Sequence, residues 1–214
     1  AYIGPRTSRF LGDNENKGGK KNDNIINNTA TLAARTLEGG MMSGLTSPSR
    51  PWFKLTVSNP QMMEYGPVKT WLWFCEQMMR DVFAKSNLYN TLMTMYESLG
   101  IYGTGVLGVF EDEDNGIHCY VFPTGSYYIA VSYKGEVDTL YREYKMTVRQ
   151  LVQQFGVDNV SQTVKILYEN NTLEQQVEVV HVIEPNTERV RGRMDKQNKP
   201  FISVYFEKSG TEGL

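Results

Sequence analysis

The chain has 214 residues, of which 40% are hydrophobic and 21% charged, so it is an ordinary globular sequence with room for one large or two small domains. Its formal net charge of −2 leaves no basic stripe, which disfavours tight, sequence-independent DNA binding. No run approaches the ~18 apolar residues of a membrane span, no signal segment opens the chain, and Cys75 and Cys119 are too few for a disulfide framework. These features predict a protein that has no membrane span and stays in the cytoplasm where it is made.

The first 24 residues are rich in Gly, Asn, Lys and Asp. This composition predicts a loosely held surface segment whose shape comes from its neighbours. The segment contains a small basic cluster of Lys17, Lys20 and Lys21. We interpret the cluster as solvated surface, with nucleic-acid contact as the alternative.

Helical periodicity dominates residues 25–102. In the first predicted helix apolar residues recur at steps of three or four, and Asp23 or Asn24 could cap its start. This apolar stripe consists of Ile26, Ala30, Ala33, Leu37, Met41 and Leu45. Three glycines between positions 39 and 44 lower the stability of the helix, so we expect either close approach of a neighbour to its surface or a frayed end.

A loop bracketed by prolines follows the first helix. Pro48 and Pro51 forbid helix, and Trp52 and Phe53 present two large rings just after the break. We predict that Arg50, Trp52 and Phe53 form a subunit interface, with an intrachain lid on the core as the alternative.

Two further helices are predicted, one from 62 or 68 to 85 and one at 87–99, with Ser86 as a cap and Gly100 as the end. The helix that ends at 85 is apolar over more than half its circumference, which predicts burial on two sides. Methionines gather on these helices at Met62, Met63, Met78, Met79, Met93 and Met95. We interpret them as core residues, with a conformable subunit interface as the alternative.

From Gly103 onward the hydrophobic period changes from that of helices to that of strands. Turn signals at the acidic run 111–116 and at 134–135 predict two hairpins, and Thr147 is expected to cap a short helix. The expected strands are 106–110 with 117–122, 127–133 with 137–144, 176–184 and 201–206, and the expected helices are 147–155 and one that includes 164–168. Residues 103–214 therefore read as an α+β part with antiparallel sheet.

Residues 103–108 match the dinucleotide pattern G-x-G-x-x-G letter for letter. That pattern holds a pyrophosphate only when a strand precedes it and a helix follows, because the helix N-terminus supplies the N–H groups and the dipole. Here a helix precedes and a strand follows. We interpret the glycines as a helix-to-strand turn, with a nucleotide-binding enzyme as the rival hypothesis.

The other candidate motifs lack the surrounding residues that their chemistry requires. A calcium loop over the acidic run would place Phe122 where a bidentate Glu is required. His118 and Cys119 are adjacent in a predicted strand, so they point to opposite faces and cannot share a metal. The sequence also lacks a Gly-x-Ser-x-Gly elbow, a Walker A motif and His-Glu-x-x-His. No catalytic residue, cofactor site or metal ligand is assigned, and no enzyme activity is predicted.

The run GMMSGLTSPSRPWF, residues 40–53, resembles a stretch near the N-terminus of the head-to-tail connecting (portal) proteins of short-tailed bacteriophages. The likeness continues in the family's order from about Arg9 to Phe206. Its further segments are 88–90, 96–105, 135–144 and 146–156. Several unrelated segments that agree in order are a more specific signal than any one motif.

The resemblance implies a structural, non-enzymatic subunit of a ring, normally dodecameric, at one capsid vertex, made in the host cytoplasm and retained in the virion. The implied partners are further copies of itself, the major capsid and scaffolding proteins, the packaging terminase and a tail or adaptor protein. Double-stranded DNA would pass through the channel without sequence specificity. The low net charge agrees with this role, because a ring through which a genome slides must not grip its phosphates. The missing Walker A motif separates the chain from the packaging ATPase.

The predicted fold is therefore α+β, with N-terminal helices packed on a mostly antiparallel sheet similar to the family's wing region. Its expected parts are a surface segment at 1–24, a helical part at 25–102 and an α+β part at 103–214. Family members are much longer than this chain, so we expect a truncated subunit, and no nucleic-acid contact can be assigned. Another head-completion or adaptor protein is the alternative function.

Overall fold

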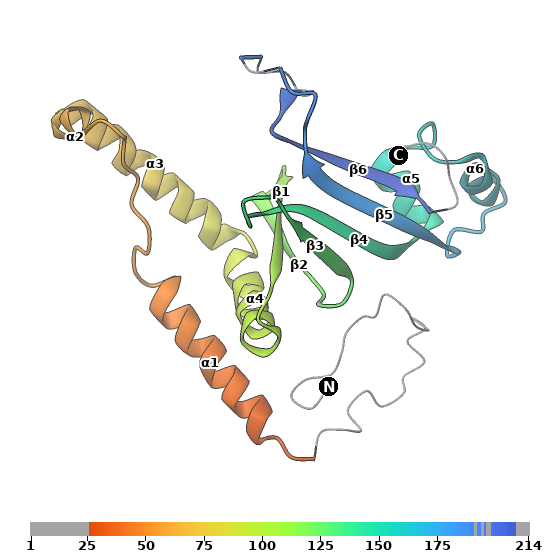
Figure 1. The fold of residues 1–214 in the computed structure, drawn as a ribbon, viewed down its shortest axis with the longest axis horizontal. Coiled ribbons are helices and arrows are strands. Elements are labelled where there is room, and N and C mark those ends of the chain that lie inside the picture. The colour runs from red at the N-terminus through yellow and green to blue at the C-terminus, as the bar shows by residue number, and fades with distance from the viewer. Residues whose placement is uncertain (1–25, 191, 194, 196–197, 209–214) are drawn as a thin grey trace. The chain divides into compact units, whose positions relative to one another are not determined.

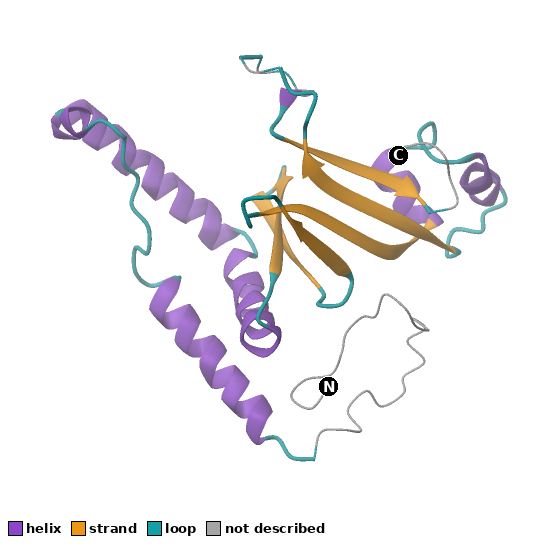
Figure 2. Ribbon diagram, viewed as in Figure 1, coloured by secondary structure: helices purple, strands orange, loops and turns teal. Residues whose placement is uncertain are grey.

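The computed structural model describes residues 26–190, 192–193, 195 and 198–208. The predicted surface segment 1–24, its lysine cluster and both candidate caps lie outside these residues. Helices and antiparallel sheets make up the described part of the chain (Figure 2), so the predicted α+β class is confirmed. None of the helices described has the length and hydropathy that crossing a bilayer requires.

The chain divides into two compact units, and the described boundary lies between Thr124 and Gly125. The β-hairpin that follows the helices belongs to the first unit, because it packs on them. The proposed parts 25–102 and 103–214 stay a prediction of domain organisation.

The first unit contains four described helices and a hairpin (Figure 1). They are α1 (Thr29–Leu45), α2 (Pro60–Glu64), α3 (Gly66–Lys85), α4 (Leu88–Tyr102), β1 (Val106–Asp112) and β2 (Gly116–Phe122). The unit has a small core, made of Met42, Leu88, Leu92, Tyr96 and Cys119. Helix α4 is at the centre of this core, since both α1 and the hairpin pack against it. The Asn87 side chain joins α4 to β2 by two hydrogen bonds with the Cys119 backbone, of 2.7 and 2.8 Å.

Helix α4 ends one turn later than predicted. Gly100 was expected to end it, but this residue lies inside the helix, where a Cβ atom would come within 2.9 Å of the Leu37 side chain of α1. The glycine at 100 therefore permits close packing of α1 on α4. The helix ends at Gly103, which adopts the left-handed conformation with φ of +75° that favours glycine.

The second unit is a four-stranded antiparallel sheet with strand order β3-β4-β5-β6 and two helices. Its elements are β3 (Tyr127–Val131), β4 (Val137–Thr147), α5 (Val148–Phe155), α6 (Gln162–Glu169), β5 (Gln176–Pro185) and β6 (Phe201–Glu207). Each strand pairs antiparallel with the next strand in the sequence. The predicted tight turn joins β3 to β4, whereas α5 and α6 lie between β4 and β5. All predicted strands and both predicted helices of this unit are present, within a few residues of their expected bounds.

The core of the second unit lies between α5, α6 and the strands β4 and β5. Its buried members are Met146, Val148, Leu151, Val160, Val164 and Val179. The predicted cap of α5 is confirmed as a capping box, in which Thr147 and Gln150 satisfy each other's backbone N–H groups. The start of α6 is held by the buried Glu207 carboxylate, which accepts hydrogen bonds from the backbone and hydroxyl of Ser161.

Candidate subunit interface

Arg50, the first of the three predicted interface residues, is exposed and caps the end of α1. Its guanidinium donates hydrogen bonds to the carbonyl oxygens of Ser43 at 2.7 Å and Gly44 at 3.3 Å. The last carbonyls of a helix have no partner within the helix, and a cation there also interacts favourably with the helix dipole. Arg50 therefore fixes the turn that carries the chain from α1 to the aromatic residues.

Trp52 and Phe53 are half-buried and form an aromatic cluster with Phe83 of α3. The Trp52 ring stacks on Phe83 with centroids 6.0 Å apart, and Phe53 lies 4.9 Å from Trp52 and 5.7 Å from Phe83. The Trp52 indole N–H also donates to the Tyr89 hydroxyl at 3.3 Å. Both rings therefore pack against side chains of their own chain, and part of the surface of each ring remains exposed to solvent. Their role as a subunit interface stays a prediction.

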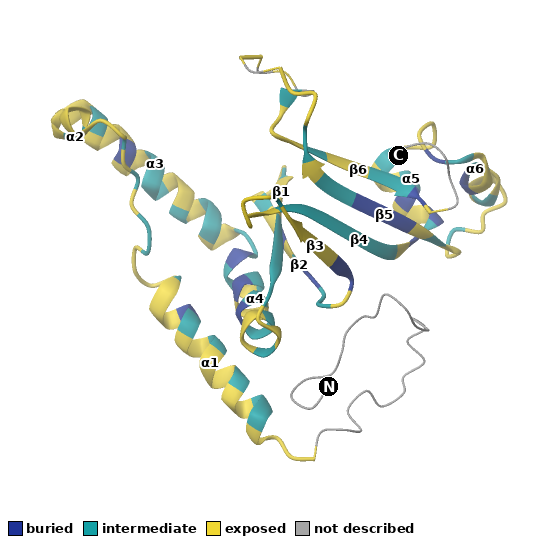
Figure 3. Ribbon diagram, in the orientation of Figure 1, coloured by how far each residue is buried: buried dark blue, intermediate teal, exposed yellow. Residues whose placement is uncertain are grey.

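The expected burial of α3 on two sides is wrong within the described chain. Of its twenty residues only Leu72 is buried. The main contacts of α3 are with α2, α4 and β2, and those with the core and the hairpin involve Phe83 and Val82 near its C-terminal end. Figure 3 shows the resulting exposure along the helix, and Figure 1 shows its α2 end extending away from α4. Trp71, Phe74 and Met78 are 55–65% exposed and lie at spacings of three and four residues, hence on one face.

We predicted that the six methionines of these helices are core residues, and this is wrong for most of them. Met62, Met78, Met79 and Met93 are exposed in this structure, while the other two are half-buried. The apolar width of α3 was recognised from the sequence but assigned to the core, since a sequence pattern cannot tell whether the covering surface belongs to the same chain.

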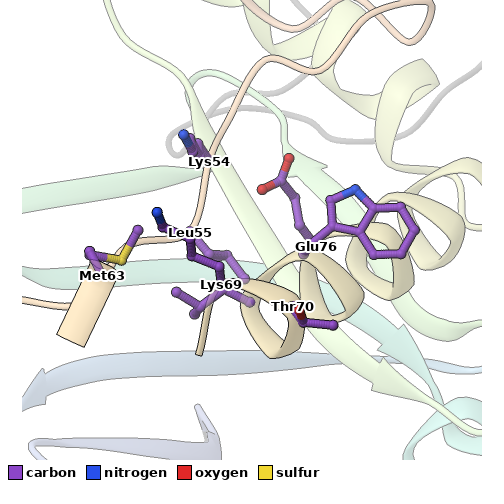
Figure 4. A pocket seen from close by; sticks show the side chains of 8 residues that line it. Lys54, Leu55, Met63, Lys69, Thr70 and Glu76 are labelled. Carbon is purple, nitrogen blue, oxygen red and sulfur yellow. The ribbon is translucent and has the colours of Figure 1, made fainter. Parts of the chain in front are cut away.

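A pocket of about 410 Å³ lies on the other side of α3, between this helix, α2 and the loop before it. Lys54 and Leu55 line it from the loop, Met63 from α2, and Thr70 and Glu76 from α3 (Figure 4). The buried Leu72, with Trp73 and Lys69, completes its lining. The pocket mixes an apolar floor with charged groups of both signs.

A shallow, largely open apolar groove runs along α1, lined by residues of this helix alone. It is lined by Ala33, Thr36, Leu37, Gly40, Met41, Gly44 and Leu45. Ile26, the first residue of the predicted apolar stripe, lies before the start of α1, and most of the remaining stripe borders this groove. Met42, which the stripe omitted, is the buried residue of the helix. Gly40 and Gly44 have no atom within 4 Å of where a Cβ would lie, so no described part of this chain makes the close approach expected there.

The structure explains the glycines of the dinucleotide-like run by packing. A Cβ at Gly105 would lie 3.2 Å from Met95, and one at Gly108 would lie 2.8 Å from the Phe110 ring. As predicted, a helix precedes the run and a strand follows it.

In the hairpin, Cys119 is buried and His118 exposed, as their adjacent positions required. Among the described residues, His, Cys, Asp and Glu nowhere gather in threes that could hold a metal.

His181 of β5 is fully buried and lies 2.9 Å through Nε2 from the Ser203 hydroxyl. Its ring stacks on Tyr205 with centroids 3.9 Å apart. Burial, and secondly the positive charge of Arg142 on the neighbouring strand, lower the pKa of His181 to about 4. So weak a base does not activate a serine, and no described side chain hydrogen-bonds Nδ1 to orient the ring. We interpret the pair as structural.

Comparison with known proteins shows to which family the chain belongs. The family described as bacteriophage head to tail connecting protein matches residues 1–214. The portal protein of Salmonella phage epsilon15 is 53% identical over 98% of this chain, and the probable portal protein of Bordetella phage BPP-1 is 44% identical over 99%. The chain spans 38% of the length of each of these two curated relatives. These matches confirm the resemblance, and the chain belongs to the bacteriophage head to tail connecting protein family.

Proposed function

We propose that the chain is part of a portal subunit, copies of which form a ring of about twelve at one capsid vertex. Double-stranded DNA enters the head through this ring during packaging and leaves through it at ejection. The ring also docks the terminase and later the tail or its adaptor, and it assembles in the host cytoplasm with capsid and scaffolding proteins. The role is structural, without catalysis.

The observation that carries this proposal is the 53% identity to a named portal protein across almost the whole chain. Two features of the chain support it. The exposed aromatic and methionine side chains of α3 have the composition of an interface between subunits. The net charge of −2 is compatible with a channel that passes DNA without binding it tightly.

The test is the mass of the full-length protein in solution, measured by native mass spectrometry, with negative-stain imaging of the same sample. We expect a closed ring of about twelve subunits around a central channel. A stable monomer or dimer that never closes would contradict the proposal and favour an adaptor or other head-completion role.

A further inference from the structure

The α2–α3 arm, defined here as residues 60–80, exposes seven large apolar side chains. Its exposed large side chains are Met62, Tyr65, Trp71, Trp73, Phe74, Met78 and Met79. At 150–250 Å² for a fully exposed large side chain, the exposed fractions of 37–65% sum to on the order of 700 Å². This area, which is distributed over more than one face of the arm, approaches the roughly 800 Å² that each partner buries in a standard protein interface.

Within the arm, Trp71, Phe74 and Met78 form a projecting row, called here the α3 ridge. All three are more than half exposed and lie on one face of the helix, so they can enter a groove together. None carries a charge. A surface that accepts the ridge must therefore be apolar and must bury no unpaired charge.

The groove on α1 meets these requirements. None of its seven lining residues is charged, and Gly40 and Gly44 leave its floor open down to the backbone. The pocket beside α3 does not meet them, because a side chain that filled it would desolvate Lys54, Lys69 and Glu76. Nucleic acid does not suit the α1 groove either, since the groove offers no positive charge to phosphates.

Building on the proposed ring, we infer that the α3 ridge of one copy packs into the α1 groove of the next copy. Successive identical subunits in a ring contact each other through two different surfaces, and such surfaces must be complementary. The chain carries both an apolar projection and an apolar groove, on helices of the same unit. This contact, repeated around the ring, also supplies the close neighbour that the α1 glycines lack within their own chain.

The first test fills the groove in the full-length protein. Gly40→Leu places a side chain in the path of the ridge and should lower the fraction of protein in rings by about tenfold or more at a fixed concentration. Gly39→Leu is the matched control, because Gly39 also has open space around it but does not line the groove, and both changes raise helix propensity equally. The control should leave the ring fraction unchanged. Equal losses in the two variants would overturn the pairing.

The second test locates the neighbour directly. Phe74→p-benzoylphenylalanine keeps an aromatic ring on the ridge and forms a covalent bond to whatever lies against it on illumination. In rings assembled from isotopically light and heavy copies, cross-links should join position 74 of one copy to peptides that cover 33–45 of another. Rings whose cross-links fall within one copy, or on a different segment, would overturn the pairing and leave the proposed ring intact. A protein that forms no ring before any substitution would overturn the proposed function, and the pairing with it.

Discussion

In the second unit, two short helices on a sheet bury Val148, Leu151 and Val179 completely, whereas in the first unit the twenty-residue α3 buries Leu72 alone. The second unit packs α5, α6 and the strands β4 and β5 into a core of its own chain, while strand residues such as Tyr128, Ile129 and Val131 stay exposed. The first covers α4 in this way but leaves the α2–α3 arm and the α1 groove open.

Because of this difference, we expect the residues that stabilise the fold and the residues that mediate ring assembly to be largely different ones. Helices in proteins obtain most of their stability from packing of an apolar face, so an uncovered α3 gains little from its own chain. On the proposed function, a neighbouring copy supplies the missing cover. Substitutions in the buried core of the second unit should then change the free energy of unfolding, while substitutions on the exposed faces of the first unit should change ring formation.

The largest expected effect comes from a comparison in which the same Leu→Ala substitution is made once in each unit. Leu151→Ala removes a fully buried side chain and should lower the free energy of unfolding by about 2–5 kcal/mol. Leu45→Ala makes the same change at a side chain that is 57% exposed and should cost less than about 0.5 kcal/mol. Urea unfolding of each variant gives the two values. Because Leu45 lines the α1 groove, its loss should instead lower the yield of rings. Comparable destabilisation by both changes would break the comparison between the units.

A second prediction compares the two histidines. The pKa of His181 is about 4 in the folded chain and 6.5 when it is exposed, so between these pH values the unfolded state binds more protons. Stability should therefore fall as the pH falls from 6.5 to 4, with a total loss of up to about 3 kcal/mol from this group. The charged and titratable side chains around it are Arg142, which opposes its protonation, and Tyr205.

His181→Gln removes this titration and should flatten the pH dependence of the free energy of unfolding between pH 6.5 and 4. His118→Gln, at an exposed residue of β2, makes the same chemical change away from the buried ring and serves as the matched control. The wild-type protein and the His181→Gln variant share every other ionisable side chain, so the difference between their slopes isolates the buried ring. A slope unchanged by His181→Gln would show that the buried ring is not the group being titrated.

The parts predicted correctly from the sequence are those determined by nearby residues. Thr147 and Gly156 bound α5 because a capping box and a terminal glycine need only a few residues of context. Alternation of apolar residues likewise identified the strands. The end of α4 was misplaced because Gly100 and Gly103 look alike in sequence, and only the contact with Leu37 explains the first of them.

The candidate site was less predictable, for a physical reason. Periodicity shows that a helix face is apolar, but not which molecule covers it. Trp71, Phe74 and Met78 belong to a helix whose apolar width predicted burial on two sides, yet all three are more than half exposed. The contacts of Arg50 with α1 could not be foreseen either, because they depend on how the loop folds back on the helix.

A third prediction, with a smaller expected loss of stability than the changes at Leu151 and His181, concerns the predicted interface itself. Trp52 is half-buried on Phe83, so Trp52→Ala should lower the free energy of unfolding by only about 1–2 kcal/mol, less than truncation of a fully buried aromatic. If its open surface also contacts a neighbouring subunit, the yield of rings at a fixed concentration should fall by more than this loss of stability explains. Tyr133→Ala, at a tyrosine that is 95% exposed in the second unit, is the control and should change neither quantity.

Ring yield and stability measured on the same samples distinguish the two hypotheses for Trp52. As an intrachain lid, Trp52→Ala would reduce ring yield only in proportion to the fraction of unfolded subunits, and at 1–2 kcal/mol that fraction stays small for a domain of ordinary stability. A large loss of rings from a largely folded protein can then come only from the surface that Trp52 leaves open. Trp52 would in that case belong to the first unit's assembly surfaces, together with the α3 ridge and the α1 groove.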